Sequence, residues 1–377
     1  MNITINYMGM AGAGQVLSYK WAEGFKQIGH QVYAILSDQV ENKQQWIELI
    51  GENHIYFVKT YRDRDHKDFV LKTIWFTTIE KSNIRKKFRG IEMDVVLNVM
   101  YHHWSHIAAS ALSRKNVVSI CHDPINHSGE KEYIKKLYVG YMKKSDQLIV
   151  LTKSFVAIAR DRFQFPEEKI IYIPHGRMNV YETNSDYDWI AEKYKGKYHF
   201  LFFGRIEKYK GLHVLAEAYK LVCEQRDDVA LTILGSGNFQ EYKSEYAKLK
   251  NVFVENRFIH DEEIGNYFAV PKTISVIPYI DATQSGVIPI AFEYGTPIIS
   301  SNQGGLKEQL NDGAIGLLYE NNDPKLLADC MLELINNDEK FQEEKVKMER
   351  HLRTLEWDLL ASEMIEELKR IQAFSVK

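Results

Sequence analysis

The sequence predicts an α/β protein with two domains, each a parallel sheet wrapped by helices. Its 377 residues exceed what one hydrophobic core usually supports, and 45% of them are hydrophobic, enough for two cores. Short runs rich in valine and isoleucine alternate with helical patterns along the whole chain, which is typical of buried parallel strands joined by helices. Because ligands of such sheets bind outside the carboxyl ends of the strands, we expect a site at a crevice between the domains.

The first half of the chain contains seven predicted strands. They are Ile3–Tyr7, Val32–Leu36, Ile55–Val58, Asp94–Val99, Val117–Cys121, Gln147–Thr152 and Ile170–Pro174. A polar stretch, Arg177–Asp188, then follows Ile173-Pro174-His175-Gly176 and has the composition of a linker. We therefore assign residues 1–175 to the first domain and 176–356 to the second.

The second half repeats the alternation. Its predicted strands are His199–Phe203, Val229–Leu234, Val252–Glu255, Ile274–Pro278, Pro297–Ser301 and Ile315–Tyr319. Helical patterns follow several of them, and the residues from Phe341 onward are helical and rich in charge. The apolar positions of this last part, from Trp357 through Leu359 to Leu368, recur at helical spacing and predict a buried face.

Composition narrows the possible functions. The net charge of −3 argues against general binding of nucleic acid. The three cysteines form no CxxC pair, and His102 and His106 lack a third ligand, so neither a disulfide framework nor a metal site is predicted. We see no signal peptide and no apolar run long enough to span a membrane, and expect a cytoplasmic protein.

Two basic stretches, Lys81–Arg89 and Lys131–Lys144, have two readings. They are either solvated helix faces or a surface that contacts an anionic membrane, where a lipid-linked acceptor would lie. The second reading would place the protein peripherally on the inner face of the membrane.

The most informative loop follows the strand His199–Phe203. Gly204 ends the strand, and Arg205 and Lys210 precede a helical pattern. A strand, a short loop and a helix start form the place where α/β proteins bind anions, and the two cations suit a diphosphate. The alternative is an ordinary connection with surface charges.

A second loop of this kind follows Ile274–Pro278. Thr283, Gln284 and Ser285 place small polar groups before a helical run expected over Ser285–Tyr294, and Gly286 exposes backbone N–H groups. Glu293 lies in an apolar part of that run, where a carboxylate is costly without partners. A ribose diol would supply the partners; otherwise Glu293 is exposed.

The first domain offers weaker candidates. Gly12 and Gly14 follow the first strand, but Leu17 stands where a dinucleotide fingerprint needs glycine. The loop would still face the crevice and admit an acceptor or a leaving phosphate. His122 closes the strand Val117–Cys121 and would also face the crevice, unless it is a structural histidine.

With these motifs the chain resembles the family-4 retaining glycosyltransferases of the GT-B fold, over nearly its whole length. The motifs that carry the resemblance are Gly204-Arg205, Lys210-Gly211, Leu234-Gly235-Ser236-Gly237, Ala282–Gly286, Glu293, Gly304-Gly305-Leu306 with Glu308, and the hinge-like Ile173–Gly176. The resemblance implies two Rossmann-like domains facing a crevice, with a final helix at roughly 357–377 that crosses back to the first domain.

The resemblance also implies roles for the site residues. Arg205 and Lys210 would grip the donor diphosphate, and His122 would reach the donor sugar; these three form the predicted catalytic set. Donor-binding roles fall on Gly12, Gly14, Gly204, Gly235, Arg257, Phe258, Thr283, Gln284, Ser285, Gly286 and Glu293. Within this set, Glu293 would bind the ribose, and Arg257 and Phe258 would lie beside the nucleobase. In one departure from the family pattern, Ser285 replaces the first glutamate of Glu-x7-Glu.

The function that follows is transfer of a hexose from a nucleoside-diphosphate sugar, with UDP favoured, to a hydroxyl of a glycan or lipid-linked acceptor. The resemblance implies retention of configuration and a role in surface polysaccharide assembly. We expect no cofactor and no metal, because the two cations and the backbone amides can neutralise the diphosphate. The alternatives are a catalytically silent nucleotide-sugar-binding or scaffold protein and a same-fold epimerase or phosphorylase.

Overall fold

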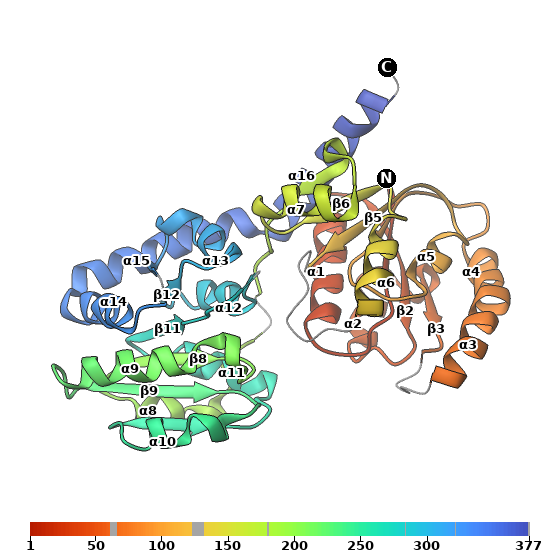
Figure 1. Ribbon diagram of the computed structural model, residues 1–377. Helices are drawn as coiled ribbons and strands as arrows, with labels where there is room; N and C mark the ends of the chain where they lie inside the picture. Colours follow the sequence, from red (N-terminus) through yellow and green to blue (C-terminus); the bar gives the residue numbers. More distant parts are fainter. Residues whose placement is uncertain (61–65, 123–131, 179–180, 283, 321, 376–377) are drawn as a thin grey trace. The chain divides into compact units, whose positions relative to one another are not determined.

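The computed structural model describes residues 1–60, 66–122, 132–178, 181–282, 284–320 and 322–375, and divides the chain into two compact units. The N-terminal unit is Met1–Pro174 with Glu356–Lys377, and the C-terminal unit is His175–Leu355. Each unit is a parallel sheet with helices on both faces (Figure 1). The predicted fold class is therefore confirmed.

The N-terminal unit has a seven-stranded sheet in the order β3-β2-β1-β4-β5-β6-β7. Its strands are β1 (Asn2–Tyr7), β2 (Gln31–Ser37), β3 (Ile55–Val58), β4 (Glu92–Asn98), β5 (Ser113–Cys121), β6 (Gln147–Val150) and β7 (Ile170–Tyr172). Its helices are α1 (Ala13–Gln27), α2 (Lys43–Ile50), α3 (His66–Trp75), α4 (Lys81–Lys87), α5 (Ser105–Ala109), α6 (Glu132–Met142), α7 (Ser154–Phe163) and α16 (Trp357–Ser375). The inner strands are almost wholly buried, as their unbroken apolar runs predict.

The last helix, α16, returns to the N-terminal unit and packs on α1. Gly24 of α1 makes this possible, because a Cβ there would lie 2.4 Å from the carbonyl oxygen of Trp357. The Trp357 ring meets Trp21 edge to face, with 5.3 Å between the ring centroids. One residue of the predicted apolar face is misplaced: Leu359 is 52% exposed, whereas Leu360 and Leu368 are buried.

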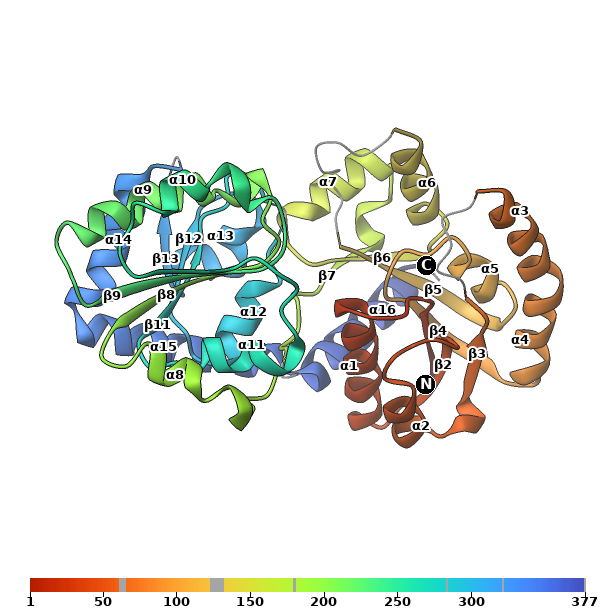
Figure 2. The same cartoon turned by 90° about the horizontal axis from the view of Figure 1, so that it is seen from below.

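The C-terminal unit has a six-stranded sheet in the order β10-β9-β8-β11-β12-β13. Its strands are β8 (Tyr198–Phe203), β9 (Val229–Leu234), β10 (Val252–Glu255), β11 (Thr273–Ile277), β12 (Ile298–Ser301) and β13 (Leu317–Tyr319). Its helices are α8 (Trp189–Lys193), α9 (Leu212–Cys223), α10 (Lys243–Tyr246), α11 (Asp261–Phe268), α12 (Val287–Glu293), α13 (Gly305–Gln309), α14 (Pro324–Asn336) and α15 (Asp338–Leu352). Figure 2 shows α9 and α14 on one face of this sheet and α8 and α11 on the other.

The strand order places the ligand loops of the C-terminal unit. The chain winds outward from β8 to β10 and then returns to the other side of β8 with β11, so the winding direction reverses between β8 and β11. Ligands of doubly wound sheets bind at such a switch point, outside the carboxyl ends of the strands. The loops after β8 and β11 are those that contain Arg205 and Ser285.

Candidate functional site

The loop after β8 is held closely against the loop after β9. Gly204 N–H donates to the Leu234 carbonyl at 3.0 Å, and Ile206 N–H donates to the Ser236 carbonyl at 2.8 Å. A Cβ on Gly235 would lie 1.9 Å from the Gly204 carbonyl oxygen, and Gly235 has a φ of 139°. The structure thus gives Gly235 a packing reason to be glycine, and its contact with a donor stays a prediction.

The same loop is also fixed to the loop after β11. Gly211 has a φ of 69°, and a Cβ there would lie 1.8 Å from the Pro278 carbonyl oxygen. Ile280 N–H donates to the Tyr209 carbonyl at 2.8 Å. Three loops at the carboxyl ends of β8, β9 and β11 therefore form one packed group, which contains Arg205 and Lys210.

Lys210 is held in an aromatic setting that disfavours its charge. Its Nζ lies 3.6 Å from the centroid of the Tyr279 ring and 5.0 Å from that of Tyr209. Burial lowers the pKa of Lys210 from 10.5 to about 8, and the positive charge of Arg205 acts in the same direction. Arg205 is exposed and makes no hydrogen bond or ion pair within the described part of the chain. A bound anion would relieve the repulsion between these two cations.

Ser285, in the loop after β11, is buried and hydrogen-bonded within the chain. Its side chain is buried, accepts a hydrogen bond from Val287 N–H at 3.2 Å, and lies 3.2 Å from the Tyr279 hydroxyl. Its own N–H donates to Gln309 Oε1 at 2.7 Å, and Gln309 Nε2 donates to its carbonyl at 3.1 Å. Gln309 therefore takes the Ser285 N–H, and the donor-binding role of Ser285 stays a prediction.

The neighbours of Ser285 differ from it. Gly286 is exposed at a φ of −69°, and a Cβ there would meet nothing within 4 Å. Neither its backbone conformation nor its surroundings in the chain require glycine. Gln284 is half-buried, and Thr283 lies outside the described residues. The helix begins at Val287, two residues later than expected.

Glu293 has its partner within the chain. Arg177 Nε donates to Glu293 Oε1 at 2.6 Å, and an Arg177 terminal nitrogen donates to Oε2 at 2.7 Å. The carboxylate side chain is only 9% exposed, so this two-point pair satisfies a buried charge. The alternative of an exposed Glu293 is therefore wrong, and its predicted contact with a ribose stays a prediction.

Arg257 and Phe258 lie on the loop between β10 and α11. Two Arg257 nitrogens donate to the two Glu263 carboxylate oxygens at 2.6 and 2.7 Å, and these hydrogen bonds hold the pKa of Glu263 below its usual range. His260 N–H also donates to Glu263 at 2.8 Å, at the start of α11. The loop is thereby fixed, and Phe258 extends from it with 70% of its surface exposed.

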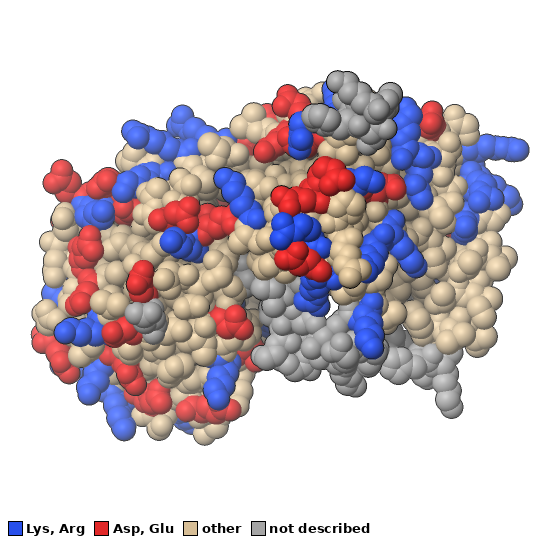
Figure 3. Space-filling model, turned by 45° about the horizontal axis from the view of Figure 1, so that its top comes forward, with Lys and Arg blue, Asp and Glu red and all other residues tan. Residues whose placement is uncertain are grey.

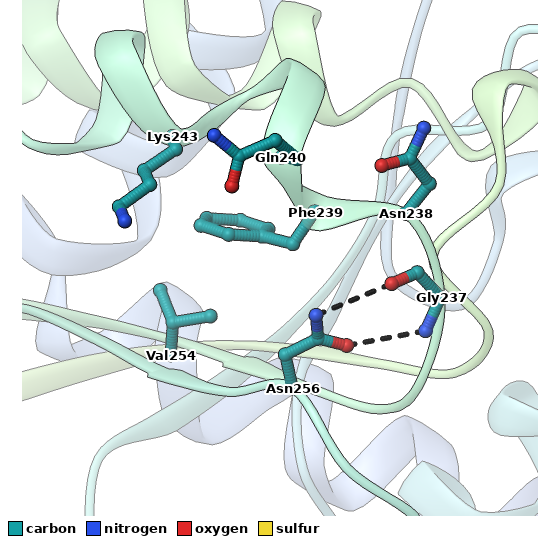
Figure 4. Close-up of a pocket in the computed structure, with 7 residues that line it drawn as sticks. All are labelled: Gly237, Asn238, Phe239, Gln240, Lys243, Val254 and Asn256. Atoms are coloured by element: carbon teal, nitrogen blue, oxygen red, sulfur yellow. Dashed lines mark hydrogen bonds between the residues drawn. The ribbon is translucent and has the colours of Figure 1, made fainter.

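A surface pocket of about 420 Å³ lies beside these loops, lined by Gly237, Asn238, Phe239, Gln240, Lys243, Val254 and Asn256. The Asn256 amide exchanges two hydrogen bonds with the backbone of Gly237, at 3.1 and 3.2 Å (Figure 4). The Phe239 ring lies between Val254 and Gln240 in this view. The pocket borders the loop after β9 but contains neither Arg205 nor Lys210.

The remaining predicted residues belong to the N-terminal unit. Gly12 has a φ of 79° and precedes α1 with open space around it, whereas a Cβ on Gly14 would lie 2.8 Å from the Tyr7 ring. His122 follows β5, and its Nε2 lies 2.8 Å from the Val99 carbonyl oxygen. Packing explains Gly14, and the donor roles of all three residues stay predictions.

The structure thus gathers Gly204, Arg205, Lys210, Gly235 and Ser285 around one end of the C-terminal sheet. Sequence reasoning missed Tyr279, Gln309 and Arg177. The position of an aromatic residue two residues after β11 could have indicated Tyr279, whereas no local pattern indicated Gln309 or Arg177. Among the described residues, no three histidine, cysteine or acidic side chains lie together as metal ligands, and no helix has the length and apolar character to cross a membrane.

Known proteins match both units. A model of the Glycosyl transferases group 1 matches residues 184–351, and a model of Glycosyltransferase Family 4 matches residues 14–177. Phosphatidyl-myo-inositol mannosyltransferase of Mycobacterium leprae is 30% identical over 170 residues, 44% of this chain and 44% of that protein, so the match spans less than half of that relative. An uncharacterized glycosyltransferase of Methanocaldococcus jannaschii is 24% identical over 327 residues, 80% of this chain and 84% of that protein.

A solved structure extends the likeness to the whole fold. Anabaena HepE in complex with UDP has a TM-score of 0.72 at 15% identity, with 98% of this chain and 100% of that chain covered. The two doubly wound sheets define the GT-B class of glycosyltransferase folds. Within that class, the chain belongs to glycosyltransferase family 4.

Proposed function

We propose that this protein transfers a hexose from a UDP-sugar to a hydroxyl of a glycan or lipid-linked acceptor, with retained configuration and without a metal, in surface polysaccharide assembly. The observation that carries the proposal is the pair Arg205 and Lys210 on a loop packed at the switch point of the sheet. Two neighbouring cations, neither of which forms an ion pair within the described residues, suit a ligand with two adjacent negative groups. The UDP bound to HepE supports the choice of nucleotide, and the lipid named for the mycobacterial relative supports a lipid-linked acceptor.

The reaction breaks the bond between the sugar C1 and the diphosphate oxygen, and the electron pair leaves with the diphosphate. Arg205 and Lys210 stabilise that developing charge, which is the main electrostatic requirement of the step. The acceptor oxygen bonds to C1 on the face that the diphosphate leaves, and its proton passes to the departing phosphate oxygen. Phe258, exposed on a fixed loop, offers a flat surface for the base.

A panel of UDP-hexoses with released UDP as the readout tests the proposal. Arg205→Ala should lower turnover by about 10²–10³-fold with unchanged circular dichroism, because it removes a fixed transition-state charge. Lys208→Ala, an exposed lysine of the same loop, is the matched control and should leave turnover unchanged. Near-normal turnover in Arg205→Ala would refute the diphosphate role.

Two further measurements separate the finer parts of the proposal. Proton NMR of the product distinguishes retention from inversion at C1. Turnover that disappears in EDTA and returns with Mg²⁺ would refute a metal-independent reaction.

One observation favours a second candidate, a silent nucleotide-sugar-binding protein: Ser285, where the family pattern has an acid, is buried and tied to Tyr279 and Gln309. Thermal stabilisation by UDP-sugars without any UDP release would support that candidate.

A further inference from the structure

A single helical segment at the edge of the N-terminal unit has one side fixed to the core. It consists of α3, a π-helical turn at Phe76–Glu80, and α4 in direct succession. The Phe76 ring stacks on Trp104 with 4.7 Å between centroids, and buried Glu80 accepts a hydrogen bond from the Tyr56 hydroxyl at 2.6 Å. These contacts define which side of the segment faces inward.

The outward side of the first half is apolar. Its exposed residues are Val70 (59%), Leu71 (67%), Ile74 (56%) and Ile79 (51%), with Phe69 at 38%. The other large hydrophobic side chains exposed among the described residues are spread singly over the two units. Scattered exposed hydrophobics are ordinary, but a contiguous group marks an interaction surface.

The outward side of the second half is cationic. Arg85, Lys86, Lys87 and Arg89 are all exposed, and the one acidic residue between positions 69 and 89 is the buried Glu80. Figure 3 shows lysines and arginines at the right-hand edge, where Figure 1 places α4, and uncharged surface next to them on the same edge. The segment thus presents apolar and cationic surface in succession.

We propose that the segment from Phe69 to Arg89 docks on an anionic lipid bilayer. The apolar residues of α3 and the π-helical turn enter the boundary between headgroups and acyl chains, and the cations of α4 contact lipid phosphates. The positive charge of the segment is the reason for choosing an anionic bilayer rather than a second copy of the chain. In a symmetric contact with a second copy, parallel segments would oppose cations to cations, and antiparallel segments would oppose cations to the apolar half.

The second basic stretch is not part of this surface. Lys136 on α6 and Lys143 and Lys144 just after it are exposed, but Leu137 is the one large hydrophobic side chain exposed among the described residues of that helix. Lys131 and the side chain of Lys135 lie outside the described residues. The proposal is independent of the donor, because every residue of the surface belongs to the N-terminal unit.

Co-sedimentation of the full chain with vesicles tests the proposal. We expect binding to vesicles of equimolar phosphatidylcholine and phosphatidylglycerol, and much weaker binding to phosphatidylcholine alone. Leu71→Asp with Ile74→Asp should lower the partition coefficient at least about tenfold, because both apolar contacts are lost. Lys86→Glu with Lys87→Glu should lower it by about fivefold for each unit of charge removed, and added salt should mimic this effect.

The controls carry the same kinds of charge change at exposed residues of the other unit. Val346→Asp, at a residue 45% exposed, and Lys248→Glu with Lys250→Glu should bind vesicles as the wild type does. Circular dichroism and the urea midpoint verify that each variant is folded. Leu71→Gln alone provides a milder apolar change should the double variant unfold.

Four outcomes would overturn the proposal: no binding of the wild type, equal binding to both kinds of vesicle, unchanged binding of the α3 and α4 variants, or equal losses in the controls. Self-association without vesicles that Leu71→Asp with Ile74→Asp abolishes would assign the surface to a second copy instead. UDP release measured without vesicles tests the donor site separately, so failure of one proposal leaves the other standing.

Discussion

Replacing Lys210 with methionine should make the protein more stable at neutral pH while weakening donor binding. The ammonium lies among the rings of Tyr209 and Tyr279, and burial lowers its pKa from 10.5 to about 8. At about 1.4 kcal/mol per pKa unit, holding the charge there costs about 3 kcal/mol of folding free energy. Attraction between the ammonium and the Tyr279 ring offsets about 1 kcal/mol of this. Lys210→Met should therefore gain about 2 kcal/mol at pH 7.

The pH dependence gives a sharper check. Between about pH 8 and 10.5 the unfolded chain holds a proton on Lys210 that the folded chain has lost. Unfolding then takes up a proton, so a rising pH opposes unfolding and stabilises the wild type. The advantage of Lys210→Met should shrink across this window, and the other titrating groups cancel in the comparison.

Urea unfolding followed by circular dichroism, at several pH values from 7 to 10, measures the difference. The chain has two compact units, so the comparison uses the transition that the substitution displaces. Arg205→Ala serves as a control, because removing the neighbouring positive charge should raise the Lys210 pKa and reduce the effect. A variant less stable than the wild type at pH 7, or a difference that stays constant from pH 7 to 10, would refute the reasoning.

Other substitutions test the remaining contacts. Glu293→Gln removes the buried carboxylate charge that Arg177 contacts and should lower the free energy of unfolding by about 2–3 kcal/mol, measured by urea unfolding; no loss would show that the pair is not stabilising. Gly235→Ala should cost more than about 3 kcal/mol, because its Cβ would overlap a carbonyl, whereas Gly286→Ala should leave stability unchanged. A loss of UDP affinity in folded Gly286→Ala would then report a ligand at this backbone, and unchanged affinity would exclude one. Phe258→Ala should leave the unfolding free energy within about 0.5 kcal/mol and weaken UDP binding about tenfold in calorimetry; equal affinity would remove the ring from the base site.

Local pattern was enough to predict the sheets. Each predicted strand is present, with ends that differ by up to four residues, because runs of Val and Ile between glycine-rich loops carry their own signal. The loop at Gly204–Gly211 was also predictable, since its residues are consecutive.

Contacts between distant residues were not predictable. Arg177 contacts Glu293 across 116 positions, and Gln309, the last residue of α13, contacts Ser285 across 24 positions, so no local spacing encodes either pair. The apolar side of α3 has the same pattern as a core helix, and only tertiary contacts, those of Phe76 and Glu80, show which side faces inward. Leu359 was predicted to be buried because it belongs to an apolar helical pattern, and the pattern alone does not show which side of the helix packs on the core.

The hydrogen bond between Arg177 N–H and the Leu355 carbonyl, 3.0 Å long, has a consequence for how the chain is built. These residues stand near the beginning and at the end of the C-terminal unit, so the two points where the polypeptide enters and leaves it are adjacent. A module with touching ends can be cut out or replaced without stretching what remains. The C-terminal unit is in this sense a separable module, and a few residues joining Pro174 to Glu356 would reconnect the chain if it were removed.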